Sequence, residues 1–174
     1  MHIVYNLIKK NSVITFRDLQ EKRGEVVAAQ VDLRRELIKI VSRLKSVFEK
    51  SLSLPQRQWK DPATDEMVDY VHILTDEDGE TGIMQPYEMN FDEHMAVSFL
   101  LAVVIDQSPT SFPKTTMAVP VSIKRDKGGF LIRLRDGEYE TSVPQLFNDA
   151  ELVEVSEVIK RFILKDLDDL IPAK

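Results

Sequence analysis

The sequence predicts an α+β protein in which a long N-terminal helix and a C-terminal helix pack on an antiparallel sheet of about four to five strands. Apolar residues recur at helical spacing over residues 15–52, alternate at strand spacing over residues 67–136, and return to helical spacing over residues 148–171. Helices and strands are therefore segregated along the chain, which favours an antiparallel over an alternating parallel fold. The length suits one domain over residues 1–174.

The first predicted helix carries two rows of apolar residues, which together form a stripe wider than a coiled-coil seam. A wide stripe is typical of a helix that packs on a domain core. Gly24 lowers helix stability by about 1 kcal/mol relative to alanine and suggests a break near residues 23–25. Pro55 ends the element. The first row is Leu19, Val26, Leu33, Leu37, Ile40, Leu44 and Val47.

Two apolar runs around the turn residues Asp-Lys-Gly-Gly, residues 117–125 and 129–135, predict a β-hairpin. Pro120 removes a backbone donor, so we expect this strand to lie at an edge of the sheet or to carry a bulge. A further strand is predicted over residues 68–74, with one face formed by Val68, Tyr70, His72 and Leu74.

The apolar run over residues 95–105 fits either a buried strand or a helix capped by Asn90. Its valines and isoleucine favour the strand. Near the C-terminus, Asn148 or Asp149 is expected to cap a helix that Pro172 stops.

Charge is distributed unevenly along the chain. Residues 1–60 contain 13 Lys and Arg against 6 Asp and Glu, whereas residues 61–174 contain 10 against 23. Between Lys60 and Lys114 there are twelve acidic residues and no Lys or Arg. A surface of one sign attracts oppositely charged partners and speeds their association. We therefore expect an acidic sheet surface that engages a basic protein.

Composition excludes several classes of site. The chain has no cysteine, so it forms neither disulfides nor thiolate metal sites. The N-terminal residues lack the apolar region and cleavage site of a signal peptide, and no apolar run is long enough to span a bilayer. We therefore expect a cytoplasmic protein. Glycine-rich nucleotide-binding loops and the Gly-x-Ser-x-Gly nucleophile motif are absent, and no cofactor is expected.

The densest acidic stretch is residues 75–82, Thr-Asp-Glu-Asp-Gly-Glu-Thr-Gly. A calcium-binding EF-hand does not fit, because its positions 1 and 12 would be Leu74 and Gln85. Asp78-Gly79 instead predicts the turn of a hairpin. The acidic binding surface is predicted to consist of Asp76, Glu77, Asp78, Glu80, Asp92 and Glu93, and the weaker candidates for a metal site are Asp76, Asp78, Glu80 and His94.

Arg57, Trp59 and Lys60 place one aromatic ring between two cations, a pattern that could stack a base of single-stranded nucleic acid. One ring and two charges are a weak signal beside the acidic stretch that follows. We therefore expect Trp59 to pack the helix onto the sheet and do not expect nucleic-acid binding.

These observations favour a non-enzymatic binding, adaptor or inhibitor-type protein. Two alternatives stay open. One is a metal-dependent hydrolase that uses the carboxylates of residues 76–94. The other is a structural subunit of a multiprotein assembly, with a homo-oligomer formed through the long helix.

Overall fold

The computed structural model describes residues 13–77 and 80–172. The chain divides into two units, residues 1–32 and residues 33–174, and each is described by itself. The long helix α1 (Phe16–Ser51) contributes residues to both. Its bounds agree closely with the predicted range of residues 15–52, whereas the expectation of one domain over the whole chain stays a prediction.

In the first unit, α1 begins at a capping box formed by Thr15 and Asp18. The backbone N–H of Thr15 donates to the Asp18 carboxylate at 2.7 Å, and the N–H of Asp18 donates to the Thr15 hydroxyl at 3.3 Å. These bonds satisfy N–H groups that a helix start leaves unpaired. The Thr15 hydroxyl also donates to the Asp18 carboxylate at 2.7 Å, and this bond, together with that from the Thr15 N–H, lowers the pKa of Asp18. The helix continues through Gly24, so the suggested break near residues 23–25 is absent.

The second unit contains a six-stranded antiparallel sheet in the order β4-β3-β5-β6-β7-β8. A separate two-stranded sheet joins β1 (Gln58–Lys60) to β2 (Met67–Asp69). The fold class is the predicted α+β, with more strands than expected. The main strands are β3 (Val71–Glu77), β4 (Glu80–Met84), β5 (Val97–Ile105), β6 (Thr115–Asp126), β7 (Gly129–Leu134) and β8 (Tyr139–Pro144).

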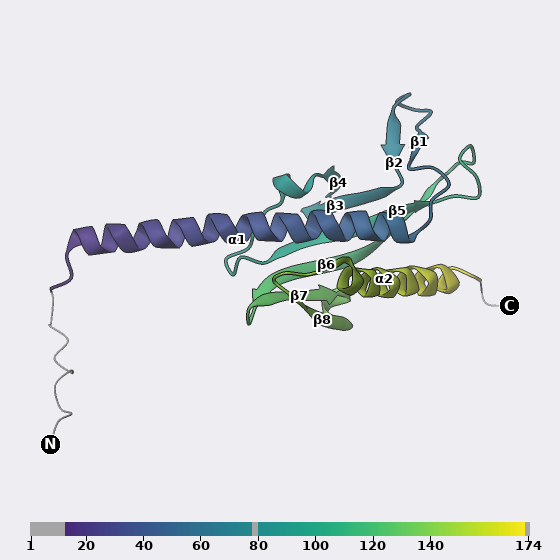
Figure 1. Cartoon of the computed structure of the whole chain (residues 1–174). Helices are drawn as coiled ribbons and strands as arrows, with labels where there is room; N and C mark the ends of the chain where they lie inside the picture. The colour runs from purple at the N-terminus through teal and green to yellow at the C-terminus, as the bar shows by residue number, and fades with distance from the viewer. Residues whose placement is uncertain (1–12, 78–79, 173–174) are drawn as a thin grey trace, which may run out of the picture. The chain divides into compact units, whose positions relative to one another are not determined.

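Within this unit, α1 from Leu33 onward and α2 (Asp149–Asp169) pack on one face of the sheet (Figure 1). Fully buried side chains from both helices and from the central strands form one core, including Leu44, Phe48 and Ile159. The part of the predicted apolar stripe that packs on the sheet comprises Leu37, Ile40, Val41, Leu44, Val47 and Phe48. Leu19 and Val26, which the sequence assigns to the same stripe, are exposed.

The run over residues 95–105 is the strand β5 rather than a helix, as the β-branched residues favoured. The predicted hairpin around Asp-Lys-Gly-Gly is formed by β6 and β7. Pro120 lies in a strand with neighbours on both sides, so the edge prediction is wrong for β6 as a whole. Pairing with β7 begins only at Val121, however, so Pro120 itself faces a paired strand on the β5 side alone.

The predicted strand over residues 68–74 is two strands, because the ladder breaks at Tyr70. After the break, Val71 and Ile73 face the core, and His72 lies on the opposite face beside Ala102. His72 is nevertheless buried, and this burial lowers its pKa. The sequence also missed β1 and β8. Two short 3₁₀ helices, Pro86–Glu88 and Arg135–Gly137, complete the fold.

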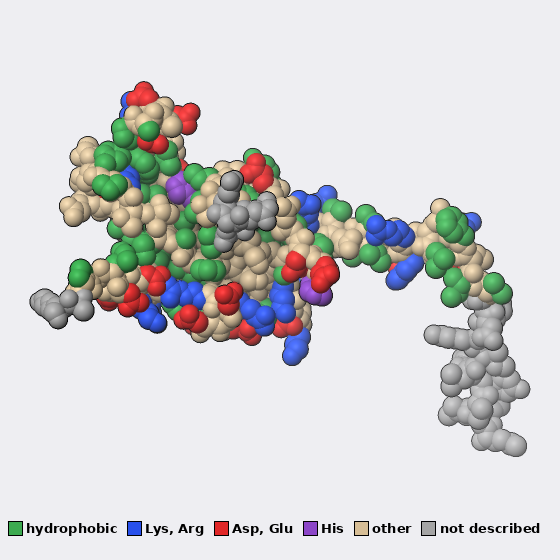
Figure 2. Space-filling view, turned by 180° about the vertical axis from the view of Figure 1, so that it is seen from behind, with side chains coloured by type: hydrophobic (Ala, Val, Ile, Leu, Met, Phe, Trp, Pro, Cys, Tyr) green, Lys and Arg blue, Asp and Glu red, His purple; other side chains and the backbone are tan. Residues whose placement is uncertain are grey.

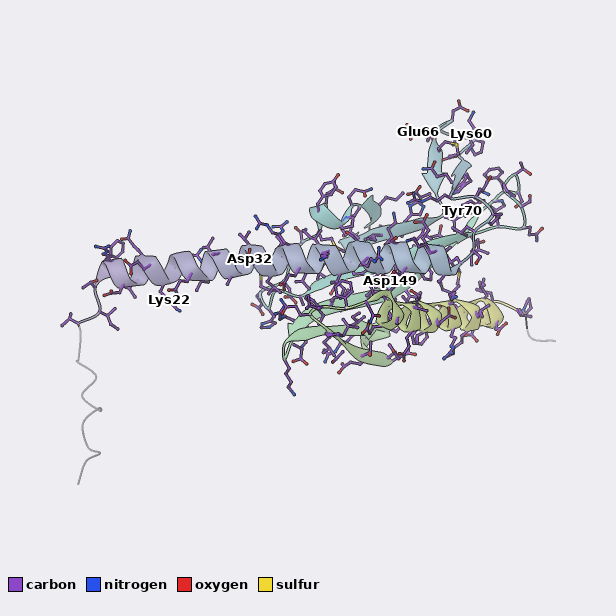
Figure 3. All side chains as sticks on the ribbon, in the orientation of Figure 1. Lys22, Asp32, Lys60, Glu66, Tyr70 and Asp149 are labelled. Carbon is purple, nitrogen blue, oxygen red and sulfur yellow. The ribbon has the colours of Figure 1, made fainter. Side chains whose placement is uncertain are left out.

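The helix α2 begins at the predicted cap, Asn148. Its side chain accepts a hydrogen bond from the Ala150 N–H at 2.7 Å, and Glu151 completes a capping box. Asp149 lies beside α1 (Figure 3), where both of its oxygens accept hydrogen bonds from Arg43 at 2.7 Å. This bidentate pair joins the two helices of the second unit.

Candidate functional site

The acidic stretch around residue 78 lies in the β3–β4 hairpin, and β4 is one of the two edge strands of the six-stranded sheet. The backbone register sets Asp76 opposite Thr81 and Glu77 opposite Glu80. Like charges directly opposite each other destabilise a strand pair. Residues 78–79 and the side chains of residues 76, 77 and 80 lie outside the described part, so the predicted roles of Asp76, Glu77, Asp78 and Glu80 stay predictions.

Three other carboxylates of the lysine-free stretch are paired with lysines from outside it. Asp65 lies 2.5 Å from the Lys60 Nζ, and Asp69 lies 3.7 Å from the Lys45 Nζ of α1. Asp106 is paired with Lys114. Lysines at both ends of the stretch and on α1 therefore offset part of its self-repulsion.

Asp92 holds a turn. Its Oδ1 accepts hydrogen bonds from the backbone N–H groups of His94 and Ala96, both at 2.8 Å. Glu93 and His94 are exposed, and the His94 Nε2 lies 3.4 Å from the Glu93 Oε1. Among the described residues, no group of three His, Asp or Glu side chains is placed to hold a metal ion. The described contacts of Asp92 therefore give it a structural role, as the acceptor that stabilises this turn.

One cluster in the second unit combines an ion pair with aromatic rings. It consists of Lys114, Asp106, Tyr70, Trp59 and Phe112, and we call it the Lys114 cluster. The Lys114 side chain is only 5% exposed and pairs with Asp106, which also accepts a 2.7 Å hydrogen bond from the Tyr70 hydroxyl. The Nζ lies 4.8 Å from the ring centroids of Trp59 and Phe112 and 5.8 Å from that of Tyr70. Three aromatic rings therefore surround one buried ammonium group.

Two groups in this cluster, the Asp106 carboxyl and the Tyr70 hydroxyl, have shifted pKa values. The hydrogen bonds from Lys114 and Tyr70 lower the pKa of Asp106 because they stabilise its charged form. Burial and the adjacent Asp106 raise the pKa of the Tyr70 hydroxyl. At neutral pH the cluster therefore holds a carboxylate and a neutral phenol. It fastens residues 106–114 to the β1–β2 sheet.

The three candidates for nucleic-acid contact have partners within the protein. Arg57 pairs with Glu49, and Lys60 pairs with Asp65 near the tip of the β1–β2 sheet (Figure 3). The Trp59 ring packs 5.9 Å from that of Phe112, and its Nε1 is buried without a hydrogen-bond partner among the described residues. Trp59 therefore packs β1 onto the loop before β6, not α1 onto the sheet. The aromatic and basic residues in Phe112-Pro113-Lys114 were the one sequence signal for this cluster.

A groove in the second unit has a volume of about 950 Å³ and lies between α1 and the residues that lead into α2. It is lined in part by Lys39, Arg43, Gln145, Leu146 and Asp149. Two of the lining side chains, those of Arg43 and Asp149, pair with each other, and a third, that of Asn148, caps α2. The groove therefore has both polar and apolar lining residues, and three of its polar side chains already have partners within the protein.

The first unit presents apolar side chains to solvent. All the described residues from Val13 to Asp32 are exposed, and Figure 2 shows hydrophobic and basic side chains along this unit. The exposed apolar residues on its helix and the fractions of their surface left open are Phe16 73%, Leu19 59%, Val26 41%, Val27 41% and Val31 43%. An exposed apolar helix face is typical of a docking surface.

Neither α1 nor α2, within the described residues, has a stretch long and apolar enough to cross a bilayer. Comparison with known proteins adds no function. No protein-family model matches this chain, and no curated protein or solved structure is significantly similar to it.

Proposed function

We propose that this chain is a non-enzymatic binding protein in which residues 16–32 of α1, the first-unit helix, dock onto a partner. The observation that carries the proposal is the apolar face of this helix, which is exposed over every described residue. The alternatives of an adaptor and of an assembly subunit share this element and differ only in the partner.

The way the helix is built supports the proposal. An isolated helix of about 15 residues is marginal in water, because most helical stability in proteins comes from packing. The first-unit helix nevertheless has a capping box at Thr15 and Asp18 and two ion pairs, Arg17–Glu21 and Lys22–Glu25. Such exposed pairs contribute only about 0.3–0.5 kcal/mol each. Burial of the apolar face against a partner would supply the missing stabilisation.

A capture experiment tests this role. Tagged protein is compared with a variant carrying Leu19→Ser, Val26→Ser and Val31→Ser, and with a control carrying three serines off the apolar face, Arg17→Ser, Glu21→Ser and Ala28→Ser. We expect the wild type and the control to retain the same partner from native lysate and the apolar-face variant to lose it. Equal retention by all three proteins would argue against docking through this helix.

A second candidate is recognition of a basic protein by the β3–β4 hairpin, and the register of Glu77 opposite Glu80 favours it. Acidic residues at opposed backbone positions are unfavourable in a strand pair, so binding of a cationic side chain at this hairpin would be favoured. In this version the acidic binding surface consists of the residues expected from the sequence, Asp76, Glu77, Asp78, Glu80, Asp92 and Glu93.

Charge reversal separates this candidate from the first. Changing Asp76, Asp78 and Glu80 to lysine should weaken capture of a basic partner, most strongly at low salt, because electrostatic contacts are screened as ionic strength rises. Undiminished capture would exclude the hairpin. The alternative of a metal-dependent hydrolase requires that the carboxylates of residues 76–94 bind a metal ion. Such binding would raise the melting temperature of the protein in titrations with Mg²⁺, Mn²⁺, Ca²⁺ or Zn²⁺.

A further inference from the structure

We propose that the partner of the first-unit helix is the same helix of a second copy, paired in the antiparallel direction. This inference rests on the proposed docking role of residues 16–32 and names the occupant of their apolar face. It predicts a homodimer with a two-fold axis near the boundary between Gly24 and Glu25.

The spacing of residues along the helix defines the contact line. Leu19, Arg23, Val26 and Gln30 follow one another at steps of four, three and four, the spacing at which residues of one helix meet a second helix. We call these four residues the seam. In an antiparallel pair centred on the axis above, Leu19 faces Gln30 of the other copy and Arg23 faces Val26.

The charges of the first-unit helix are complementary to those of the same helix in reverse. Residues 16–24 contain three basic and two acidic side chains, whereas residues 25–32 contain two acidic side chains and no basic one. Antiparallel pairing sets the positive half of one copy against the negative half of the other. Parallel pairing sets like against like, which disfavours that arrangement.

Arg23 decides the direction most sharply because it lies on the seam itself. In a parallel, in-register pair, two Arg23 side chains would meet at one layer, and the repulsion between these like charges would raise the free energy of the dimer. In the antiparallel pair, the aliphatic part of Arg23 packs on Val26 and its guanidinium reaches Glu25 of the other copy.

The seam is short, which sets the expected strength. Residues 16–32 span about 25 Å at 1.5 Å per residue. Two such helices bury less than the roughly 800 Å² per partner of a standard stable interface. We therefore expect a dimer that dissociates on dilution into the micromolar range.

The absence of cysteine from the chain permits a clean test of direction. Leu19→Cys and Gln30→Cys proteins are mixed under mild oxidation. We expect a disulfide between residue 19 of one copy and residue 30 of the other. Two copies of residue 19 lie about 16 Å apart in the antiparallel pair, too far for a disulfide. Predominant 19–19 and 30–30 products would show parallel pairing and overturn the proposal.

Sedimentation velocity measures the dimer itself and tests the seam. Arg23→Glu brings a new carboxylate beside Glu25 of the other copy, so it should weaken association by about tenfold or more. Arg17→Glu makes the same change of net charge off the seam and should alter association by less than about threefold. Equal effects of the two variants would overturn the assignment of Arg23 to the seam.

Failure of this inference can be told apart from failure of the proposed function. If the protein stays monomeric up to about 1 mM, self-association is excluded. Loss of a captured partner in the apolar-face variant would then still support docking through the helix. A monomer whose capture is also unaffected by that variant contradicts both.

Discussion

The Nζ of Lys114 lies 4.8 Å from the centroid of the Trp59 ring, and the same ammonium group pairs with Asp106. The two residues come from segments 55 positions apart, so the contact fastens the loop before β6 to the β1–β2 sheet. Both members of the ion pair are largely buried, with 5% and 12% of their side-chain surfaces exposed. Loss of one member of such a pair leaves the other buried without its partner.

We therefore predict that Lys114→Met lowers the free energy of unfolding by about 2–4 kcal/mol. Methionine keeps most of the apolar stem and removes the charge. The matched control is Lys39→Met on the exposed face of α1, which should change stability by less than about 0.5 kcal/mol. Urea titration measures both variants, and equal stability of the two would show that the cluster contributes little.

The same cluster predicts a loss of stability in acid. Its hydrogen bonds from Lys114 and Tyr70 lower the pKa of Asp106 in the folded protein, so the unfolded chain binds a proton more readily. The contribution of Asp106 is thus complete above the unfolded pKa of about 4 and is lost as the pH falls through the folded pKa.

Asp106→Asn removes this titration. The difference in unfolding free energy between wild type and variant should therefore shrink as the pH is lowered from 6 toward about 2, below the unfolded pKa. Urea titrations at several pH values measure it. A difference that is constant over this range would show that Asp106 does not titrate differently in the folded and unfolded states.

A leucine-to-alanine change in α1 should lower the free energy of unfolding by very different amounts in the two units. Leu44→Ala removes a fully buried side chain from the core and should lower the unfolding free energy by about 3 kcal/mol. Leu19→Ala changes a residue that is 59% exposed and should cost less than about 0.5 kcal/mol in dilute monomer. Chemical denaturation at low protein concentration compares them. A large effect of Leu19→Ala in the monomer would mean that the first-unit helix packs within its own chain.

Two substitutions of Asp92 distinguish its role in the turn from the contribution of its charge to recognition. Asp92→Ala removes the acceptor for two backbone N–H groups and should destabilise the fold by roughly 1 kcal/mol. Asp92→Asn keeps an acceptor oxygen but removes the charge, so it should retain most of that stability. If the asparagine variant also captures a basic partner as well as wild type does, the charge of Asp92 plays no part in recognition.

Local patterns were sufficient wherever a segment's own residues set its conformation. The ends of α1 and α2, the β6–β7 hairpin and the strand nature of residues 97–105 follow from periodicity, turn residues and capping chemistry. The prediction that Pro120 lies at a sheet edge was also correct in part, because the first half of β6, which includes Pro120, pairs only with β5.

Other features depended on contacts that no local pattern encodes. The break at Tyr70 is one example: its hydroxyl bonds to Asp106, 36 residues away. The short β1 and the polar β8 carry too little apolar alternation to stand out, and both form because a neighbouring strand offers its backbone groups. The lysines that pair with Asp69 and Asp106 lie outside the acidic stretch in sequence.

The sequence by itself determined the α+β class, the long helix with its wide apolar stripe, and the segregation of charge along the chain. The fold class and the helix depend on residue types at short spacing, to which local backbone geometry responds directly, and the charge distribution is a property of the residue types themselves. Only the tertiary structure decided that the stripe is buried from Leu37 onward and exposed before Leu33. Burial depends on whether another surface reaches the helix, and that is a property of how the whole chain packs. The candidate docking surface is the first-unit part of this stripe, whose apolar side chains are exposed.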